Sequence, residues 1–181
     1  MKNNNKILPK LPASSGAFVV HKGKILLLKR DNNPKIPNPN CWSIIGGVVE
    51  KGETFEEALI RETQEEICIK PKNYSLLGQL KMFKDKITRA IFLIILDEDE
   101  ASKVRLGNEG QKLSWFTPSQ IGKINAVPEI KTFFQKNGKY IDKLIKGKIE
   151  IEDLKKYIKN EIEETSSKVL LTEPQKQQLR S

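Results

Sequence analysis

Residues 47–69 read Gly-Val-Val-Glu-Lys-Gly-Glu-Thr-Phe-Glu-Glu-Ala-Leu-Ile-Arg-Glu-Thr-Gln-Glu-Glu-Ile-Cys-Ile, a glycine-rich loop that leads into a helical pattern. Thr54 is the expected N-cap, and Glu57 three residues later completes a capping-box pattern. No proline or glycine interrupts residues 55–67. Apolar or small side chains recur there at helical spacing, at Phe55, Leu59, Thr63 and Ile67. The stretch therefore predicts a loop followed by an amphipathic helix.

Three glutamates of this helix, Glu62, Glu65 and Glu66, fall on a strip beside the apolar stripe, because residues three and four apart are neighbours on a helix. Like charges at this spacing repel, and the adjoining apolar surface adds a desolvation cost. A Mg²⁺ ion, which is commonly shared between carboxylates and substrate phosphates, offsets both costs. Arg61 can pair with Glu65 four residues later. A solvated acidic helix face is the alternative, which we favour for Glu56, Glu57 and Gln64.

The order of these residues resembles the signature of the Nudix hydrolases, which has glycine, glutamate, arginine-glutamate and a glutamate pair at fixed spacings. The residues in register are Gly47, Glu53, Arg61, Glu62, Glu65 and Glu66. There are two departures: Cys68 replaces a glycine of the pattern, and Ile45 stands where many members have proline. A glycine enters the left-handed conformation freely, so Cys68 is expected to cost about 1 kcal/mol or to shift the turn. Neither departure removes a predicted metal ligand, and we expect activity.

The resemblance implies an α/β/α sandwich with a mixed sheet, and Mg²⁺-dependent hydrolysis of a nucleoside diphosphate linked to another group, with Mn²⁺ as a substitute ion. By the same resemblance, the metal ligands are the carbonyl of Gly46 and the carboxylates of Glu62, Glu65 and Glu66. Glu109, in the sequence Glu109-Gly110-Gln111 before the Trp115 strand, is expected to be a further ligand or the general base; a solvated loop glutamate is the alternative. Glu53 and Arg61 are expected to support the loop and helix.

Candidate substrate contacts are Arg30, Gly46, Gly47 and Trp42. Arg30 follows an expected strand at a position that leads toward the nucleotide in the family, and an ordinary surface arginine is the equal alternative. Trp42 could stack on a base, but packing beside the glycines is the favoured interpretation. Asn125 lies where some relatives recognise the base, an alignment to which we give no weight.

The 181 residues are enough for one domain with a tail, and the net charge of +9 suits polyphosphates or nucleic acid. Lysine, asparagine and isoleucine are common throughout, so this charge can equally reflect compositional bias. Cys41 and Cys68 form no disulfide framework or zinc pattern, and His21 falls in an expected hairpin turn. No signal peptide or membrane span is recognisable, so we expect a cytoplasmic protein without a membrane partner.

The expected organisation is a flexible arm at 1–14, a Nudix domain at 15–138 and a helical extension with a polar tail at 139–181. Strands are expected at 17–20 and 25–28 as a hairpin, at 74–83, at 89–96 as a buried central strand, and at 113–116.

Residues 31–41, with three prolines, are expected to be an extended loop, and 84–86 a polar turn. The acidic residues 97–100 are interpreted as a solvated loop. A short helix is expected at 118–122, and another from Val127-Pro128 to a stop at Asn137-Gly138. Residues 140–162 are compatible with a helix broken at Gly147, and 163–181 are expected to be disordered.

A nucleoside triphosphate is the favoured substrate, including an oxidised one such as 8-oxo-dGTP. The alternatives are nucleotide sugars, the 5′ end of RNA, or an inactive Nudix module that binds nucleotide or a partner. The loop after Phe83 lacks the proline associated with ADP-ribose hydrolysis and the tyrosine associated with dinucleoside polyphosphates. RNA is a possible but not a favoured partner, and the sequence leaves both a monomer and a homodimer open.

Overall fold

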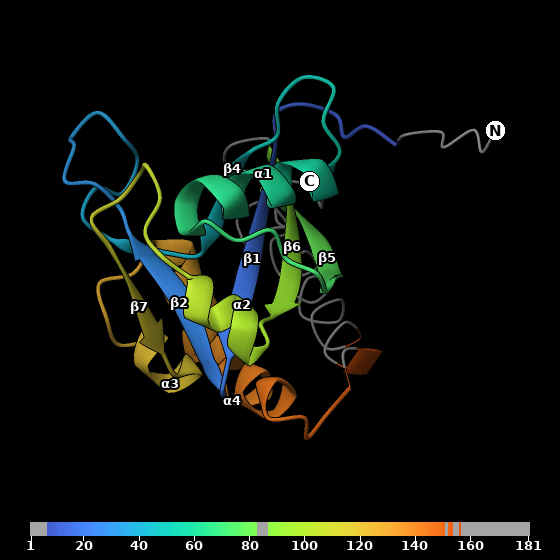
Figure 1. The fold of residues 1–181 in the computed structure, drawn as a ribbon, viewed down its shortest axis with the longest axis vertical. Coiled ribbons are helices and arrows are strands. Elements are labelled where there is room, and N and C mark those ends of the chain that lie inside the picture. The colour runs from blue at the N-terminus through green and yellow to red at the C-terminus, as the bar shows by residue number, and fades with distance from the viewer. Residues whose placement is uncertain (1–6, 83–86, 151, 154–155, 157–181) are drawn as a thin grey trace, which may run out of the picture.

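A mixed seven-stranded sheet is the centre of the molecule (Figure 1). The computed structural model describes residues 7–82, 87–150, 152, 153 and 156. The strands are β1 (Ala13–His21), β2 (Lys24–Lys29), β3 (Trp42–Ser43), β4 (Ile45–Val48), β5 (Tyr74–Met82), β6 (Ile87–Ile95) and β7 (Lys112–Phe116). The helices are α1 (Phe55–Ile67), α2 (Glu98–Lys103), α3 (Pro118–Ile121) and α4 (Pro128–Ile145).

Strand β1 organises the sheet because it pairs with three others. It runs parallel to β6 along one edge, from the pair Ala13–Thr88 to the pair Val20–Ile95. Antiparallel β2 and β4 share its other edge. Strand β2 continues beyond β1 to pair with β3, and β7 lies along its opposite edge. Strand β5 then pairs with β6, so β6 lies inside the sheet, as predicted for residues 89–96.

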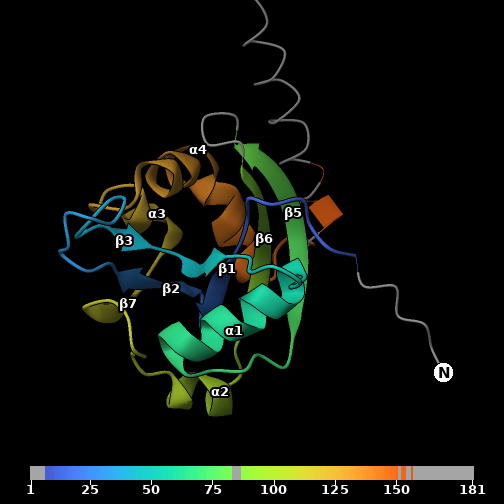
Figure 2. The ribbon, with the colours of Figure 1, turned by 90° about the horizontal axis from the view of Figure 1, so that it is seen from above.

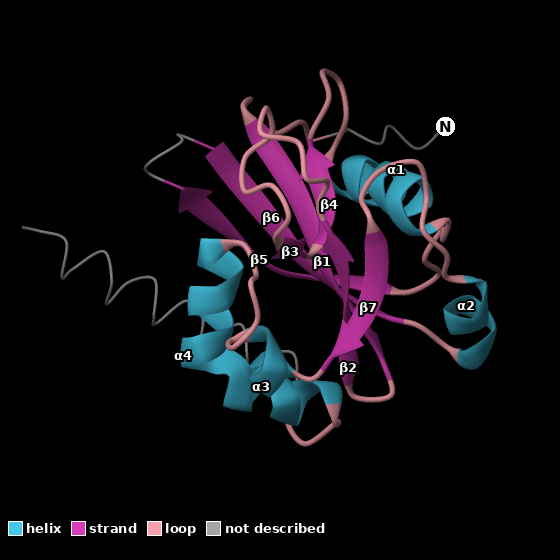
Figure 3. Ribbon diagram, turned by 90° about the vertical axis from the view of Figure 1, so that its left-hand side faces the viewer, coloured by secondary structure: helices cyan, strands magenta, loops and turns pink. Residues whose placement is uncertain are grey.

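Helices cover both faces of this sheet, as Figures 2 and 3 show: α1 and α2 lie on one side, and α3 and α4 on the other. Successive residues of a strand point to opposite faces. Accordingly, Val19 and Leu26 belong to the core with α1, whereas Phe18 and Ile25 belong to the core with α4. The predicted α/β/α sandwich with a mixed sheet is therefore confirmed.

The predicted hairpin of β1 and β2 is also confirmed, with Lys22 and Gly23 as its turn. Both have positive φ, 46° and 70°, and His21 pairs with Lys24 across the turn. Two residues with positive φ form the type of turn whose twist matches that of the flanking strands. The short helix α3 begins at Pro118 after its N-cap Thr117, as predicted.

Two predictions about helices were wrong. The predicted stop at Asn137-Gly138 lies inside α4, which continues to Ile145 because Ile141 and Leu144 are buried against the sheet. The proposed domain boundary at 138/139 consequently falls within this helix, which ends just before Gly147, at φ 65°. The acidic residues 97–100 are not a loop but begin α2, with Asp97 as N-cap.

Several expectations lie outside the described residues: the turn at 84–86, most of the helix at 140–162 beyond Glu150, and the polar tail at 163–181. Within the described ranges, no helix combines the length and apolar character needed to cross a membrane.

Candidate active site

The predicted helix has the bounds that the sequence indicates. Thr54 Oγ1 accepts a hydrogen bond from the Glu57 amide at 3.1 Å, and Glu57 Oε2 accepts one from the Thr54 amide at 2.8 Å, which completes the capping box. At the other end, Cys68 is left-handed, with φ 58° and ψ 29°, and its amide donates to the Thr63 carbonyl. The turn for which the family pattern has glycine is therefore present with a cysteine in it.

Two adjacent glycines bring the backbone of β4 against the sheet and the helix. Gly46 has φ +136°, and a Cβ there would overlap the Ser15 carbonyl and come within 2.6 Å of Gly16 Cα. A Cβ on Gly47 would instead overlap the Glu62 carboxylate, with Glu62 Cδ only 2.6 Å away. The first glycine thus allows a close backbone approach, and the second leaves room for a functional side chain.

Arg61 connects the glycine loop to the acidic strip of α1. Its Nε lies 2.9 Å from Glu53 Oε1, and its Nη2 donates to the Val48 carbonyl at 2.9 Å. Its Nη1 lies 2.7 Å from Glu62 Oε1 and 3.2 Å from Glu65 Oε2. The hydrogen bond from Arg61 is the largest cause of the lowered pKa of Glu53. Arg61 thus links Glu53 and the Val48 carbonyl to two glutamates of the strip, and the supporting role of Glu53 and Arg61 stays a prediction.

The three glutamates differ strongly in exposure. The Glu65 side chain is 53% exposed, whereas that of Glu62 is 13% exposed and Glu66 as a residue is 8% exposed. Burial raises the pKa of Glu66 to about 8, although its Oε2 accepts a hydrogen bond from the Gly46 amide at 2.9 Å. Burial also raises the pKa of Glu62, despite Arg61. Two carboxylates are thus held where their negative charge is incompletely compensated.

The loop that carries Glu109 is attached to the carboxyl end of α1. The amides of Arg105, Gly107 and Asn108 donate to the carbonyls of the last turn of α1, those of Ile67, Glu66 and Glu65, at 3.3, 2.9 and 3.2 Å. After burial, the charge of Glu109 is among the causes that raise the pKa values of Glu62 and Glu66. The structure therefore brings Glu109 to the acidic strip from 43 residues further along the chain. The sequence did not predict that these three amides attach the loop to α1. It also did not predict the close contact at Gly107, where a Cβ would overlap the Glu65 carbonyl.

Arg30 lies on the same side of the molecule. Its charge lowers the pKa of Glu66, against the larger effect of burial, and its Nε donates to the Pro37 carbonyl at 3.1 Å. Gln111 Nε2 donates to the Arg30 carbonyl at 2.6 Å and to Asn40 Oδ1 at 3.2 Å, which joins the Glu109 loop to Arg30 and to the loop at 31–41. Arg30 is therefore placed to add one positive charge beside the carboxylates.

Trp42 lies in the core, in agreement with the favoured packing interpretation. It is 9% exposed, and its ring meets Phe116 edge-on, with centroids 4.9 Å apart. Lys29 and Lys112 place their Nζ atoms 5.6 and 5.7 Å from the ring centroid. Its faces are thus largely covered, and we no longer count Trp42 among the substrate contacts.

The acidic strip fits a divalent cation by its chemistry, since all the candidate ligands are hard oxygens, Glu66 is buried and Glu62 is partly buried. Among the described residues, no three acidic, histidine or cysteine side chains already converge on one point. Glu62 and Glu65 turn to Arg61 instead, and Glu66 turns to the Gly46 amide. The residues that would hold the cation are Glu62, Glu65, Glu66 and Glu109. The Gly46 carbonyl stays a predicted ligand.

Comparison with known proteins agrees with this geometry. The model of the NUDIX domain family matches residues 10–137. The chain belongs to the NUDIX family. An ADP-ribose pyrophosphatase of Methanocaldococcus jannaschii is 33% identical over 115 residues, which are 62% of this chain and 66% of the relative. The 8-oxo-dGTP diphosphatase of Escherichia coli K12 is 32% identical over 112 residues, which are 61% of this chain and 82% of the relative.

Among solved structures, the MutT protein of Methanosarcina mazei Go1 is similar, with a TM-score of 0.57 and 25% identity. The similarity covers 71% of this chain and 94% of the archaeal protein. The expected Nudix hydrolase, with a MutT-like fold, is thus confirmed at the level of the family. The names of the relatives include more than one substrate, so the substrate of this Nudix chain is a separate question.

Proposed function

We propose that this Nudix protein hydrolyses nucleoside triphosphates to a monophosphate and pyrophosphate, with Mg²⁺ as cofactor. One observation carries the proposal: Glu66 is buried and Glu62 partly buried, both with raised pKa values, and the Glu109 loop is attached to the same helix. Burying carboxylates without full compensation costs free energy, which a bound cation recovers. Mn²⁺ is expected to substitute for Mg²⁺, because both take oxygen ligands.

The roles of the residues follow from their positions. Bound Mg²⁺ would neutralise phosphate charge and lower the pKa of a coordinated water. Glu62, Glu65 and Glu66 would hold it, and Glu109 would complete the ligand set or accept the proton of the attacking water. Arg30 would bind a phosphate oxygen, and the backbone of Gly46 and Gly47 stays a predicted substrate contact. No side-chain nucleophile is required, in keeping with the single histidine of the sequence.

The choice of a triphosphate, including an oxidised one such as 8-oxo-dGTP, is supported by the name of the Escherichia coli relative. The relative named ADP-ribose pyrophosphatase supports a second candidate, ADP-ribose, and has similar identity to this chain. The sequence argument against ADP-ribose concerns the loop at 83–86, which lies outside the described residues. Nucleotide sugars and the 5′ end of RNA stay as further alternatives.

Product analysis with a substrate panel tests the proposal. The purified chain would be incubated with Mg²⁺ and nucleoside triphosphates, 8-oxo-dGTP, ADP-ribose, nucleotide sugars or 5′-triphosphorylated RNA. We expect pyrophosphate and a monophosphate from a triphosphate, with turnover lost in Glu65→Gln. Glu56→Gln is the matched control, because Glu56 is an exposed residue of the same helix that we assign to the solvated face.

Each outcome is decisive. Hydrolysis of ADP-ribose alone would leave the assignment of the metal site intact and would replace the nucleoside triphosphate by ADP-ribose as the substrate. Equal activity of Glu65→Gln and Glu56→Gln would refute the assignment of the acidic strip as the metal site. Nucleotide binding without turnover in Mg²⁺ or Mn²⁺ would favour the inactive binding module.

A further inference from the structure

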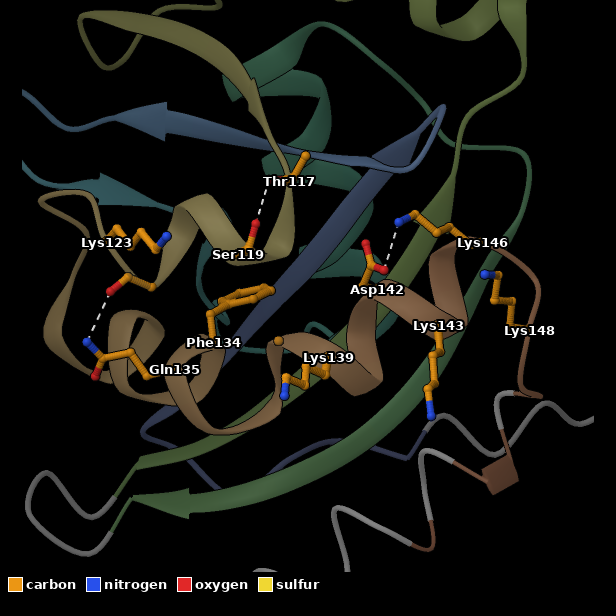
Figure 4. Close-up of a pocket in the computed structure, with 12 residues that line it drawn as sticks. Thr117, Ser119, Lys123, Phe134, Gln135, Lys139, Asp142, Lys143, Lys146 and Lys148 are labelled. Atoms are coloured by element: carbon orange, nitrogen blue, oxygen red, sulfur yellow. Dashed lines mark hydrogen bonds and ion pairs between the residues drawn. The ribbon is translucent and has the colours of Figure 1, made fainter.

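A hollow of about 820 Å³ lies between α3 and α4 (Figure 4), two helices on the face of the sheet opposite to α1 (Figure 3). Its floor includes the buried Phe134, and its α3 side carries the hydroxyl groups of Thr117 and Ser119. Five lysines line it: Lys123, Lys139, Lys143, Lys146 and Lys148. We call this hollow the lysine groove. It shares no lining residue with the acidic strip, so the proposed hydrolysis does not account for it.

The charge of the lysine groove is poorly balanced. Asp142 is the only acidic lining residue, and its Oδ2 already pairs with Lys146 Nζ at 2.8 Å. Lys143 Nζ lies over the Tyr140 ring, 5.7 Å from its centroid. For Lys123, Lys139 and Lys148, no acidic partner occurs among the residues that the structure describes. The groove therefore offers several uncompensated ammonium groups to an anionic ligand.

The arrangement of the lysines indicates an extended ligand. Lys139 and Lys143 lie one turn apart on α4, and Lys148 follows the end of that helix, so these three lysines succeed one another beside the groove; Lys146, at the C-cap, is engaged by Asp142. The four residues of helix from Lys139 to Lys143 correspond to about 6 Å, and Lys148 lies beyond the end of the helix, so the three lysines are not grouped around one phosphate. Figure 4 shows the amino groups of Lys139, Lys143 and Lys148 apart from one another and not directed at one point, whereas Lys146 turns to Asp142. A chain of phosphates matches this arrangement.

We propose that the lysine groove binds single-stranded RNA through its phosphate backbone. An open groove lined by lysines is a common way to follow a single strand without reading its sequence. Thr117 Oγ1 donates to Gln120 Oε1 at 3.0 Å and lies 3.1 Å from Ser119 Oγ, and both hydroxyl oxygens keep lone pairs that can accept a further hydrogen bond. Such groups can bond to a ribose 2′-hydroxyl, which DNA lacks. This inference does not rest on the proposed hydrolysis.

Binding can be measured on the full chain by fluorescence anisotropy, with a labelled 12-nucleotide RNA that has a 5′-hydroxyl. EDTA replaces Mg²⁺, so hydrolysis of phosphoanhydrides plays no part. The logarithm of the affinity should fall with the logarithm of salt with a slope of roughly −2 to −3, as for three or four phosphate contacts on a single strand. DNA of the same sequence should bind several times more weakly.

The test variant is Lys139→Gln/Lys143→Gln/Lys148→Gln, and the matched control is Lys10→Gln/Lys24→Gln/Lys70→Gln. The control removes the same charge from exposed lysines outside the groove. At 0.1 M salt, the groove variant should lose about 100-fold in affinity and about two units of salt slope, because each phosphate contact on a single strand contributes roughly fivefold there. The control should change affinity by less than threefold.

Three results would overturn the proposal. If the two variants lose affinity equally, binding follows net charge and not the groove. An affinity for DNA or for ATP equal to that for RNA would remove the assignment to RNA. Absence of binding at 50 mM salt would remove the site altogether. The unfolding midpoints of both variants, compared with that of the parent chain, verify that each is folded.

Discussion

Substitution of the two adjacent glycines by alanine should separate stability from activity. At Gly46 the new side chain would be forced to φ +136°, a conformation essentially confined to glycine that costs about 1–3 kcal/mol elsewhere. Its Cβ would also press on the backbone of β1, including Gly16 Cα at 2.6 Å, and such overpacking costs about 1–3 kcal/mol. Gly46→Ala is therefore expected to lose about 4 kcal/mol, a large part of an ordinary domain stability.

At Gly47 the obstacle is the end of a flexible side chain. The Glu62 carboxylate, with Cδ 2.6 Å and Oε2 2.8 Å from the added Cβ, can rotate away. This rotation breaks the ion pair between Glu62 and Arg61. Alanine also restricts the unfolded chain more than glycine does, which stabilises the folded protein by about 0.4–1 kcal/mol and offsets the loss of the pair. Gly47→Ala should thus stay within about 1 kcal/mol of the parent stability. A ligand moved by about 1 Å should nevertheless reduce turnover by about 100-fold.

Urea unfolding, Mg²⁺ titration and turnover of the best substrate from the panel provide the readouts. In a double-mutant cycle with Glu62→Gln, the activity losses should not add, because both changes act on one carboxylate. Additive losses would show that Gly47 acts by another route. Full activity of Gly47→Ala, or parent stability of Gly46→Ala, would refute the steric reasoning outright.

Three further predictions concern the surroundings of the site. Cys68→Gly should raise the free energy of unfolding by up to about 1 kcal/mol, since glycine adopts φ 58° without strain; a lower urea midpoint would contradict this. Gly107→Ala should reduce both urea stability, by about 1–3 kcal/mol, and turnover, because its Cβ would push the Glu109 loop from the Glu65 carbonyl; unchanged kcat would separate this loop from catalysis. Glu53→Gln should cost about 2 kcal/mol at pH 7. Because Arg61 lowers the pKa of Glu53, the stability it contributes is complete above about pH 4.5, and the difference in urea midpoint should shrink as the pH falls through the lowered pKa.

Local sequence signals located the helix of the acidic strip because they act within a few residues. The Thr54–Glu57 capping box starts it, and Cys68 ends it in the conformation expected for the replaced glycine. The same capping logic could have found α2, whose Asp97 and Glu100 form a second box. The acidic composition of that segment concealed the pattern.

The error in α4 has a tertiary cause. Asn137-Gly138 resembles a turn, but Asn137 is 3% exposed, and a Cβ on Gly138 would meet only ordinary contacts. Burial of Ile141 and Leu144 beyond it exceeds the modest cost of one glycine in a helix. The parallel pairing of β1 with β6, and the three amides that hold the Glu109 loop, join distant segments. No local pattern encodes such contacts.

The two residues that depart from the family signature, Ile45 and Cys68, both fit their surroundings in the structure. Ile45 is fully buried in β4, in the core that also contains Leu59 and Ile67 of α1, so it packs the glycine loop onto the helix. Cys68 closes α1 through its amide, and the amides of Arg105, Gly107 and Asn108 also hold the helix end. Neither residue displaces a predicted ligand from the acidic strip. The surroundings of Ile45 and Cys68 therefore give little reason to suspect an inactive module. The open question is which substrate the protein hydrolyses.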